Sequence, residues 1–325
     1  MPADVSPDRA TAIAAIRDAI ARVRENVARV IVGRDDVIEL ALVAMLCNGH
    51  VLIEDVPGLG KTMLAKALAR SVGCTFRRIQ FTPDLMPSDV TGINFYNQKS
   101  GEFEFRAGPL IANIVLADEI NRATPRTQSA LLEAMEEQQM TIDGVTQRLP
   151  QPFLVLATQN PIELEGTFPL PEAQLDRFLL RVRMGYPDAA EEDAILLRFE
   201  SENPLDALRP AIEATELVRL AALLPSVHCD PSVRAYIVSL ARATREHASV
   251  ELGASPRATL ALFRASRALA AVRGRDYVLP DDVKQLAPAV LGHRIMLSSQ
   301  SRLRGRDAES LVRDLLDQLP VPVEG

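Results

Sequence analysis

In the first half of the chain, short apolar runs alternate with stretches that have helical spacing. The apolar runs lie at about 50–54, 75–81, 114–117 and 153–157. Between them, apolar residues recur every three to four positions, as they do in amphipathic helices. Strands that alternate with helices in this way form a parallel sheet with helices on both faces. We therefore expect an α/β fold with a three-layer αβα core.

The pattern changes after Tyr186–Pro187, which predicts a domain boundary. The predicted core, residues 1–187, begins with a helix at about 7–30. Residues 188–325 show helical patterns only, interrupted by prolines, and end in a loose tail. The sequence thus predicts a small all-α domain after the core.

Two insertions interrupt the alternation of strands and helices in the predicted core. One spans about 92–107 and has turn residues at Lys99–Gly101, and the other spans about 139–149 and has Asp143–Gly144 at its centre. Alternating residues on both sides of such a turn are typical of β-hairpins.

Composition excludes some classes of protein. The net charge of −7 and the pI of about 5.3 argue against a broad surface for nucleic acid or anionic membranes. The three cysteines are far apart in sequence, so neither a disulfide framework nor a zinc cluster is expected. Charged residues interrupt every apolar run, and the N-terminus lacks an apolar signal core. We therefore expect a cytoplasmic protein that does not insert into a membrane.

The segment LIEDVPGLGKT, residues 52–62, follows a predicted strand and opens a predicted helix. It matches the phosphate-loop pattern G-x-x-x-x-G-K-[ST] except at the first position, which is Asp55. Lys61 would reach the β- and γ-phosphates, and the Thr62 hydroxyl would bind Mg²⁺. A carboxylate about 4 Å from a phosphate charge would cost roughly 1 to 4 kcal/mol per charge pair. Asp55 is therefore expected to point away from the nucleotide.

Polar residues that follow two other predicted strands supply the remaining chemistry. Asp118 and Glu119 end the run IVLADE, and Asn160 follows FLVLATQ. Beside a phosphate loop, Asp118 would help to hold Mg²⁺ and Glu119 would deprotonate the attacking water. Asn160 could position the same water. Taken alone, each of these motifs could equally be an ordinary turn.

Two arginines occupy positions of interest, and Arg177 is a candidate for stabilising charge on the γ-phosphate. Arg177 follows a loop and a short predicted helix, and Arg257 lies in the first turn of a helix capped by Ser255. Taken alone, either could be a surface or capping residue.

In order along the chain, these motifs resemble the AAA+ ATPases, and among them the MoxR family. The similar segments are IVGRDDVI, VLIEDVPGLGKT, ADEINRATPRTQSALLEAMEE, ATQNPIELEGTFPLPEAQLDRF and GASPRATLAL, within residues 32–295. Asp55 is common in this family's version of the loop. The resemblance implies that Arg177 is the arginine finger, with Arg122 and Arg126 as alternatives, and that Arg257 is sensor 2. It also implies the nucleotide-binding residues Val32, Gly33, Pro57, Gly58, Leu59, Gly60, Lys61, Thr62, Met63, Asp118 and Arg257. Of these, Thr62 and Asp118 would also bind Mg²⁺. The catalytic residues would be Glu119, Asn160, Arg177 and Lys61.

ATP is favoured over GTP because the sequence contains no N-K-x-D motif. The resemblance implies an ATPase that forms a ring, a hexamer, in which Arg177 acts on a neighbour's ATP and Arg257 acts within its own chain. It also implies a chaperone-like role toward a partner with a von Willebrand factor A domain, or toward a metallo-enzyme. The alternatives are a chelatase-type motor for metal insertion, a nucleic-acid remodeller and a nucleotide-gated scaffold. Neither sequence-specific nucleic-acid binding nor membrane insertion is expected.

Overall fold

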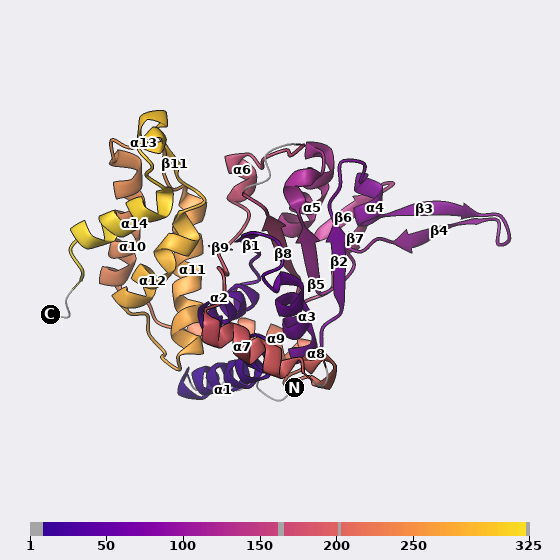
Figure 1. The fold of residues 1–325 in the computed structure, drawn as a ribbon, viewed down its shortest axis with the longest axis horizontal. Helices are drawn as coiled ribbons and strands as arrows, with labels where there is room; N and C mark the ends of the chain where they lie inside the picture. The colour runs from indigo at the N-terminus through magenta and orange to yellow at the C-terminus, as the bar shows by residue number, and fades with distance from the viewer. Residues whose placement is uncertain (1–8, 162–165, 201–202, 323–325) are drawn as a thin grey trace, which may run out of the picture.

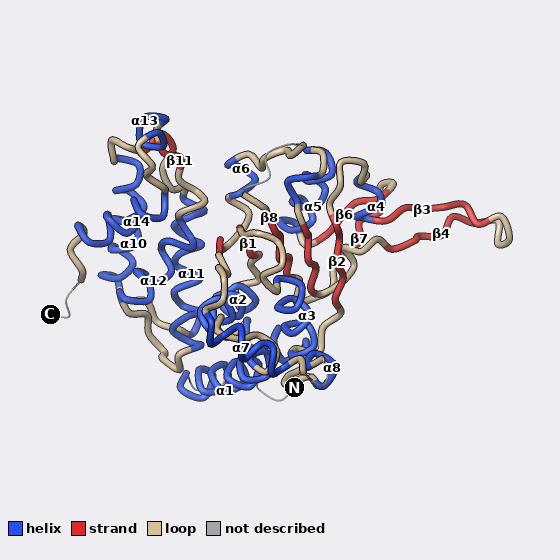
Figure 2. The backbone as a smooth tube through the Cα atoms, in the orientation of Figure 1, coloured by secondary structure: helices blue, strands red, loops and turns tan. Residues whose placement is uncertain are grey.

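The computed structural model describes residues 9–161, 166–200 and 203–322. At its centre lies a parallel sheet of five strands in the order β2-β5-β8-β1-β9 (Figures 1 and 2). The strands are β1 (Val51–Glu54), β2 (Phe76–Gln80), β5 (Ile114–Asp118), β8 (Leu154–Gln159) and β9 (Leu180–Val182). Four of them lie where the apolar runs predict them. β9 has only three residues, too few for a recognisable pattern.

Each central strand divides its apolar side chains between two cores. In β5, Ile114 and Leu116 join one cluster of buried residues, whereas Val115 and Ala117 join the other. Neighbouring side chains of a strand point to opposite faces of the sheet, so both faces are covered. This confirms the three-layer αβα core.

Different helices cover the two faces. The first cluster contains buried residues of α1, α2 and α3, and the second contains those of α4 and α5. These helices are α1 (Arg9–Ala28), α2 (Asp35–Leu46), α3 (Lys61–Ser71), α4 (Pro87–Thr91) and α5 (Pro125–Glu137), with the short η1 (Ile120–Arg122) and α6 (Glu172–Leu175) between strands. Residues 7 and 8, where the first helix is predicted to begin, lie outside the described residues.

Both predicted hairpins are confirmed. The first consists of β3 (Gly92–Asn97) and β4 (Glu102–Ala107), and the second of β6 (Gln139–Ile142) and β7 (Val145–Arg148). The first projects well away from the sheet (Figure 1). At its base, a Cβ added to Gly108 would meet the Gly92 backbone nitrogen at 2.4 Å, so the two backbones approach closely there. The Asn94 side chain also donates to Asp143 of the second hairpin at 3.0 Å, which joins the two hairpins.

The residues after the core form two groups of helices. The helices α7 (Ala189–Arg198), α8 (Pro204–Ala207) and α9 (Ala214–Ala221) lie beside α1, α2 and α3 (Figure 1). The lid bundle consists of η2 (Leu224–Ser226), α10 (Pro231–Glu246), α11 (Pro256–Val272), α12 (Pro280–Leu291), α13 (Ser299–Leu303) and α14 (Ala308–Gln318). Its α11 packs against α1 and α2, so the lid shares the first cluster of buried residues.

One feature of the lid differs from the all-helical prediction. The strands β10 (Val250–Leu252) and β11 (Met296–Leu297) form a small antiparallel pair. Each is too short to give an alternating pattern, and their pairing joins segments more than 40 residues apart in sequence. Within the described ranges, no helix is long and apolar enough to span a membrane.

A buried histidine connects three elements of the core. The Nδ1 atom of His50 accepts a hydrogen bond from the Val155 backbone N–H at 3.0 Å. Its Nε2 atom lies 3.0 Å from the Met135 carbonyl oxygen and donates to it. Burial lowers the pKa of His50 to about 4, so the ring is neutral at pH 7.

His50 should make stability depend on pH. Because its folded-state pKa lies below its unfolded value, only the unfolded chain gains a proton as the pH falls below about 6.5, and stability is lost. Between pH 7.5 and pH 6, both above the pI of about 5.3, we expect this one residue to remove roughly 1 kcal/mol. Urea unfolding of wild type and His50→Leu at both pH values measures this. Equal pH dependence in the two proteins would contradict the assignment.

Candidate functional site

The loop between β1 and α3 borders a polar cavity of about 250 Å³. Gly58 and Gly60 have φ angles of 89° and 84°, in the left-handed region. A Cβ added to either would meet no atom within 4 Å, so backbone conformation rather than space requires glycine here. Gly60 is the N-cap of α3, and the unpaired N–H groups of the first helical turn therefore lie at the cavity. These features are typical of a phosphate-binding loop.

Lys61 also lines this cavity, together with Asp55, Asp118 and Glu119. Its Nζ donates to the Asp55 backbone carbonyl at 2.5 Å. Burial lowers the pKa of Lys61, and the charges of Asp55, Asp118 and Glu119 oppose this effect. The ammonium is thus held where a phosphate group would complete its coordination.

The Asp55 carboxylate is turned toward the end of β9. Its Oδ2 accepts hydrogen bonds from the backbone N–H groups of Met184 at 2.6 Å and Gly185 at 2.8 Å. The aspartate that replaces the usual glycine therefore anchors the loop to the segment that leads into α7. Asp55 also lines the phosphate cavity, so its orientation relative to a bound nucleotide stays a prediction.

Asp118, at the end of β5, is held from two sides. Its Oδ1 accepts from the Thr158 hydroxyl at 2.7 Å, and its Oδ2 accepts from Arg78 at 2.6 Å. Asp118 and Thr62 both line the cavity, and a carboxylate and a hydroxyl suit Mg²⁺. Among the described residues, no group of three or more His, Cys, Asp or Glu side chains could hold a metal. Mg²⁺ here would therefore be held partly by phosphate oxygens, as is usual for this ion.

Glu119 has an unusual backbone and a restrained carboxylate. Its φ and ψ of 57° and 50° are left-handed, which is uncommon for a residue with a side chain. Its backbone N–H donates to the Thr158 hydroxyl at 2.8 Å. Its Oε2 accepts from Gln80 at 2.8 Å and lies 3.2 Å from Arg122 Nε. Gln80 and Arg122 thus fix the position of the Glu119 carboxylate at the cavity.

Thr158 lies on the adjacent strand β8, and Asn160 directly follows the end of this strand. Thr158 contacts both acidic residues, and Asn160 is buried and lines the same cavity. The three strands β1, β5 and β8 thus bring their carboxyl ends together at one site. The sequence predicts this meeting, although it does not reveal the role of Thr158.

A second, mostly apolar hollow of about 250 Å³ adjoins the first. The two share Gly58, Gly60 and Met63 as lining residues. The other lining residues are Val30, Ile31, Val32, Arg34, Leu59, Met184, Gly185, Pro187, Ile195 and Phe199. An apolar hollow next to a phosphate cavity has the chemistry expected for the base of a nucleotide.

Helix α7 forms one wall of this hollow through Ile195 and Phe199. Arg34 holds the helix in place, since it pairs with Glu191 at 3.1 Å and donates to the Gly185 carbonyl at 3.1 Å. Gly33 is not among the lining residues, although Val32 is. Gly33 has a φ of 67°, and a Cβ there would collide with Glu191. A residue with a side chain would therefore not fit in this turn beside the hollow.

The structure does not bring Arg177 and Arg257 to the phosphate cavity of their own chain. Both line a different cleft of about 810 Å³ between the core and the lid. There both pair with Glu136 of α5. Arg257 is placed there because α11 packs against α1 and α2, away from the phosphate loop. This differs from the expectation that Arg257 contacts the nucleotide of its own chain.

Comparison with known proteins places this geometry in a family. A model of the ATPase family associated with various cellular activities (AAA) matches residues 50–180, and an AAA lid domain model matches residues 242–315. Chaperone MoxR1 of Mycobacterium tuberculosis is 43% identical over 328 residues, which cover 98% of this chain and 86% of that protein. The chain belongs to the MoxR family of AAA+ ATPases.

Two further proteins are similar to this chain over nearly its whole length. The uncharacterized protein YeaC of Bacillus subtilis is 53% identical over 300 residues, which cover 92% of this chain and 94% of that protein. A crystal structure from Cytophaga hutchinsonii, provisionally named as an ATPase, has a TM-score of 0.90 and 38% identity. It covers 96% of this chain, and this chain covers 98% of it. The structure described above is therefore that of a MoxR-family ATPase.

Several residues around the site of this MoxR-family ATPase do not stand out in the sequence. Gln80 and Arg78 contact the two acidic residues from β2, and Phe199 and Ile195 line the apolar hollow from α7. Arg78 and Gln80 are two positions apart on a predicted strand, so both side chains point to the same face of the sheet. This spacing is a signal in the sequence that the two residues act at one site. The α7 residues carry no comparable signal because their position depends on packing between distant segments.

Proposed function

We propose that this MoxR-family chain hydrolyses ATP with Mg²⁺ in the cytoplasm, and that the energy released drives maturation or activation of a partner protein. One observation supports the hydrolysis: Lys61, Thr62, Asp118, Glu119 and Asn160 line a single cavity beside an apolar hollow. The cavity suits the phosphates and the hollow suits adenine. Thr62 and Asp118 would hold Mg²⁺, which withdraws charge from the phosphate oxygens when bound.

Each residue then has one task in the reaction. The first turn of α3 and Lys61 bind the phosphates. Glu119 accepts a proton from the water that attacks the γ-phosphorus atom, and Asn160 orients this water. Cleavage of the bond between the γ-phosphorus atom and the bridging oxygen leaves ADP and inorganic phosphate.

Arg177 and Arg257 lie in the other cleft of their own chain, and Arg78, which lines the phosphate cavity, is paired with Asp118. Arg122, an alternative finger, instead pairs with Glu119. We propose that the chain forms a homo-oligomeric ring, a hexamer, in which both Arg177 and Arg257 contact the ATP of a neighbouring chain. Arginine supplied by a neighbour is a known way to stabilise charge in phosphoryl transfer.

Mixing two inactive variants should restore activity if the ring forms in this way. Glu119→Gln lacks the base but keeps both arginines, whereas Arg177→Ala lacks one arginine but keeps the base. In a mixed ring, the phosphate cavity of an Arg177→Ala chain, which keeps Glu119, can lie next to a Glu119→Gln chain, which supplies an intact Arg177. We expect each variant alone to be at least roughly 100-fold slower than wild type, and the mixture to recover a substantial fraction of wild-type activity.

The control for this experiment mixes each inactive variant with Lys61→Ala/Arg177→Ala, which can supply neither a working cavity nor Arg177. No recovery is expected in that case. Failure of the first mixture to recover, with assembly verified by light scattering, would overturn the arrangement between chains.

The joined hairpins are the proposed contact with the partner protein. Tyr96 and Phe103 lie at opposed positions on β3 and β4, with ring centroids 5.4 Å apart. They remain 54% and 75% exposed, an unusual position for large aromatic rings. Exposed aromatic rings on a projecting hairpin suit a polypeptide partner. We propose a partner with a von Willebrand factor A domain, or a metallo-enzyme.

A further inference from the structure

The cleft between the core and the lid is rich in arginine. Its lining includes Arg177, Arg257, Arg264, Arg267 and Arg294, and the acidic residues that line it are Glu136 and Asp176. This excess of positive charge favours an anionic ligand. The two acidic residues have different surroundings, and this difference distinguishes their roles.

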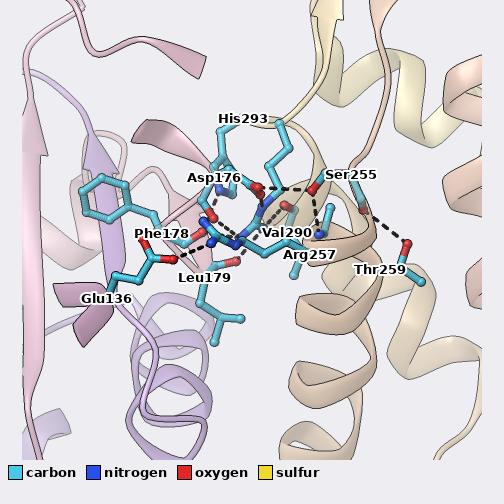
Figure 3. Close-up of polar contacts among 11 residues, drawn as sticks. Glu136, Asp176, Phe178, Leu179, Ser255, Arg257, Thr259, Val290 and His293 are labelled. Carbon is cyan, nitrogen blue, oxygen red and sulfur yellow. Dashed lines mark hydrogen bonds and ion pairs between the residues drawn. The ribbon is translucent and has the colours of Figure 1, made fainter. Parts of the chain in front are cut away.

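Asp176 fixes the start of the lid helix α11 to the core (Figure 3). Its Oδ1 accepts from Arg294 Nε at 2.7 Å, and the Arg294 side chain is almost fully buried. Its Oδ2 accepts from the Ser255 hydroxyl at 3.1 Å, and the same hydroxyl accepts from the Ala258 N–H at the N-terminus of α11. The first turn of α11, which carries Arg257, therefore has a defined position relative to the core.

Glu136 is different because its partners are partly exposed. Its Oε1 accepts from Arg257 Nη2 at 2.5 Å (Figure 3). Its Oε2 lies 3.2 Å from Arg177 Nε, an ion pair without the alignment of a hydrogen bond. One carboxylate thus pairs with a core arginine through one oxygen and a lid arginine through the other.

The two guanidinium groups keep donors for another ligand. The ion pair of Arg177 with Glu136 is formed through Nε at 3.2 Å, and the hydrogen bond that Arg257 donates to Glu136 comes from Nη2. The paired Nη groups of Arg177 form the fork that binds phosphate in a bidentate manner. The carboxylate between the two arginines offsets their mutual repulsion while the three groups together keep a net positive charge.

We propose that Glu136 is a positioning residue that holds Arg177 of the core and Arg257 of the lid as one pair, so that a terminal phosphate of the neighbouring chain's nucleotide contacts both together. This proposal rests on the function proposed above. Because the pair joins the core to the lid, the loss of that phosphate on hydrolysis releases both parts of the chain at once. Glutamine in place of Glu136 offers one acceptor oxygen and no charge, and can therefore hold only one of the two arginines.

A double-mutant cycle in the full-length protein tests the pairing. We expect Glu136→Gln and Arg257→Ala each to lower kcat roughly 10-fold at saturating protein concentration, and the double variant also to lower it roughly 10-fold rather than 100-fold. The KM for ATP should stay within about 2-fold, because the chain's own cavity is unchanged. Multiplicative effects, or unchanged kcat in Glu136→Gln, would overturn the proposal.

Glu246→Gln is the matched control, since it removes one carboxylate from an exposed ion pair with Arg242 on α10. Its kcat should equal that of wild type. Glu136→Gln should unfold within a few degrees of wild type, because partly exposed ion pairs contribute little stability. A much larger decrease in the unfolding temperature would show that Glu136 has a structural role, and would overturn the proposal. The mixture of Glu119→Gln and Arg177→Ala could recover no activity while the effects of Glu136→Gln and Arg257→Ala on kcat are still not multiplicative. In that case the proposed ring is wrong, whereas the pairing of the two arginines by Glu136 is retained.

Discussion

Replacing Glu119 with glutamine should leave ATP binding intact and lower ATP hydrolysis roughly 100-fold to 10,000-fold. Glutamine has nearly the same shape and can still contact Gln80, but it cannot accept a proton from water. Single-turnover hydrolysis and binding of a fluorescent ATP analogue together measure the two effects. Glu102→Gln, on the exposed hairpin strand β4, removes one carboxylate elsewhere and should hydrolyse ATP at the wild-type rate.

Hydrolysis within about 10-fold of wild type would mean that another group accepts the proton from the attacking water, and would remove Glu119 from the mechanism. If the loss is as large as expected, the variant is also useful for identifying the partner. It should stay in its ATP-bound state and retain a partner protein that the wild type releases. A captured protein without a von Willebrand factor A domain or a metal centre would contradict the proposed partner class.

Replacing Asp55 with glycine should weaken ATP binding about 10-fold, although it restores the general phosphate-loop pattern. The change removes the acceptor for the Met184 and Gly185 N–H groups, and each N–H left unpaired costs about 1–3 kcal/mol. Both residues line the apolar hollow, so the hollow should lose its defined shape. Asp55→Asn keeps an acceptor oxygen and should recover most of the affinity.

Inorganic tripolyphosphate separates the two parts of the nucleotide site. It can occupy the phosphate cavity but has no base for the hollow. Isothermal titration should therefore show that Asp55→Gly weakens ATP binding but leaves tripolyphosphate binding within about 2-fold of wild type. Equal weakening for both ligands would mean that Asp55 acts on the phosphate loop itself. Unchanged or tighter ATP binding would show that the aspartate has no role as an anchor.

The parts of the site that the sequence predicts are those set by local pattern. Gly60, Lys61 and Thr62 follow a strand and begin a helix, so their placement requires only one strand, one turn and one helix. Asp118 and Asn160 each lie at the end of an apolar strand. Binding sites of parallel sheets lie at the carboxyl ends of the strands, so the two residues are predicted to lie close together. Both hairpins are predictable for a similar reason, because Gly101 and Asp143–Gly144 adopt the left-handed conformations that their turns need.

The parts that the sequence does not predict depend on contacts between distant residues. Arg257 lies in the cleft with Glu136 because Arg294 binds Asp176, which is 118 residues earlier in the chain. Its place in a helix is predictable, whereas the position of that helix is not. Similarly, Ile195 and Phe199 reach the apolar hollow because Arg34 binds Glu191 of α7, which is 157 residues later in the chain. Local patterns do not contain such information.

The backbones of Gly92 and Gly108 pack closely at the root of the first hairpin, and the hydrogen bond from Asn94 to Asp143 joins this hairpin to the second. With strands of six residues, the arm beyond this root is about 20 Å long at roughly 3.4 Å per residue. A lever of that length turns a rotation of roughly 10° at the core into a displacement of about 3 to 4 Å at its tip. Small adjustments around the nucleotide would thus be amplified mechanically where Tyr96 and Phe103 are exposed.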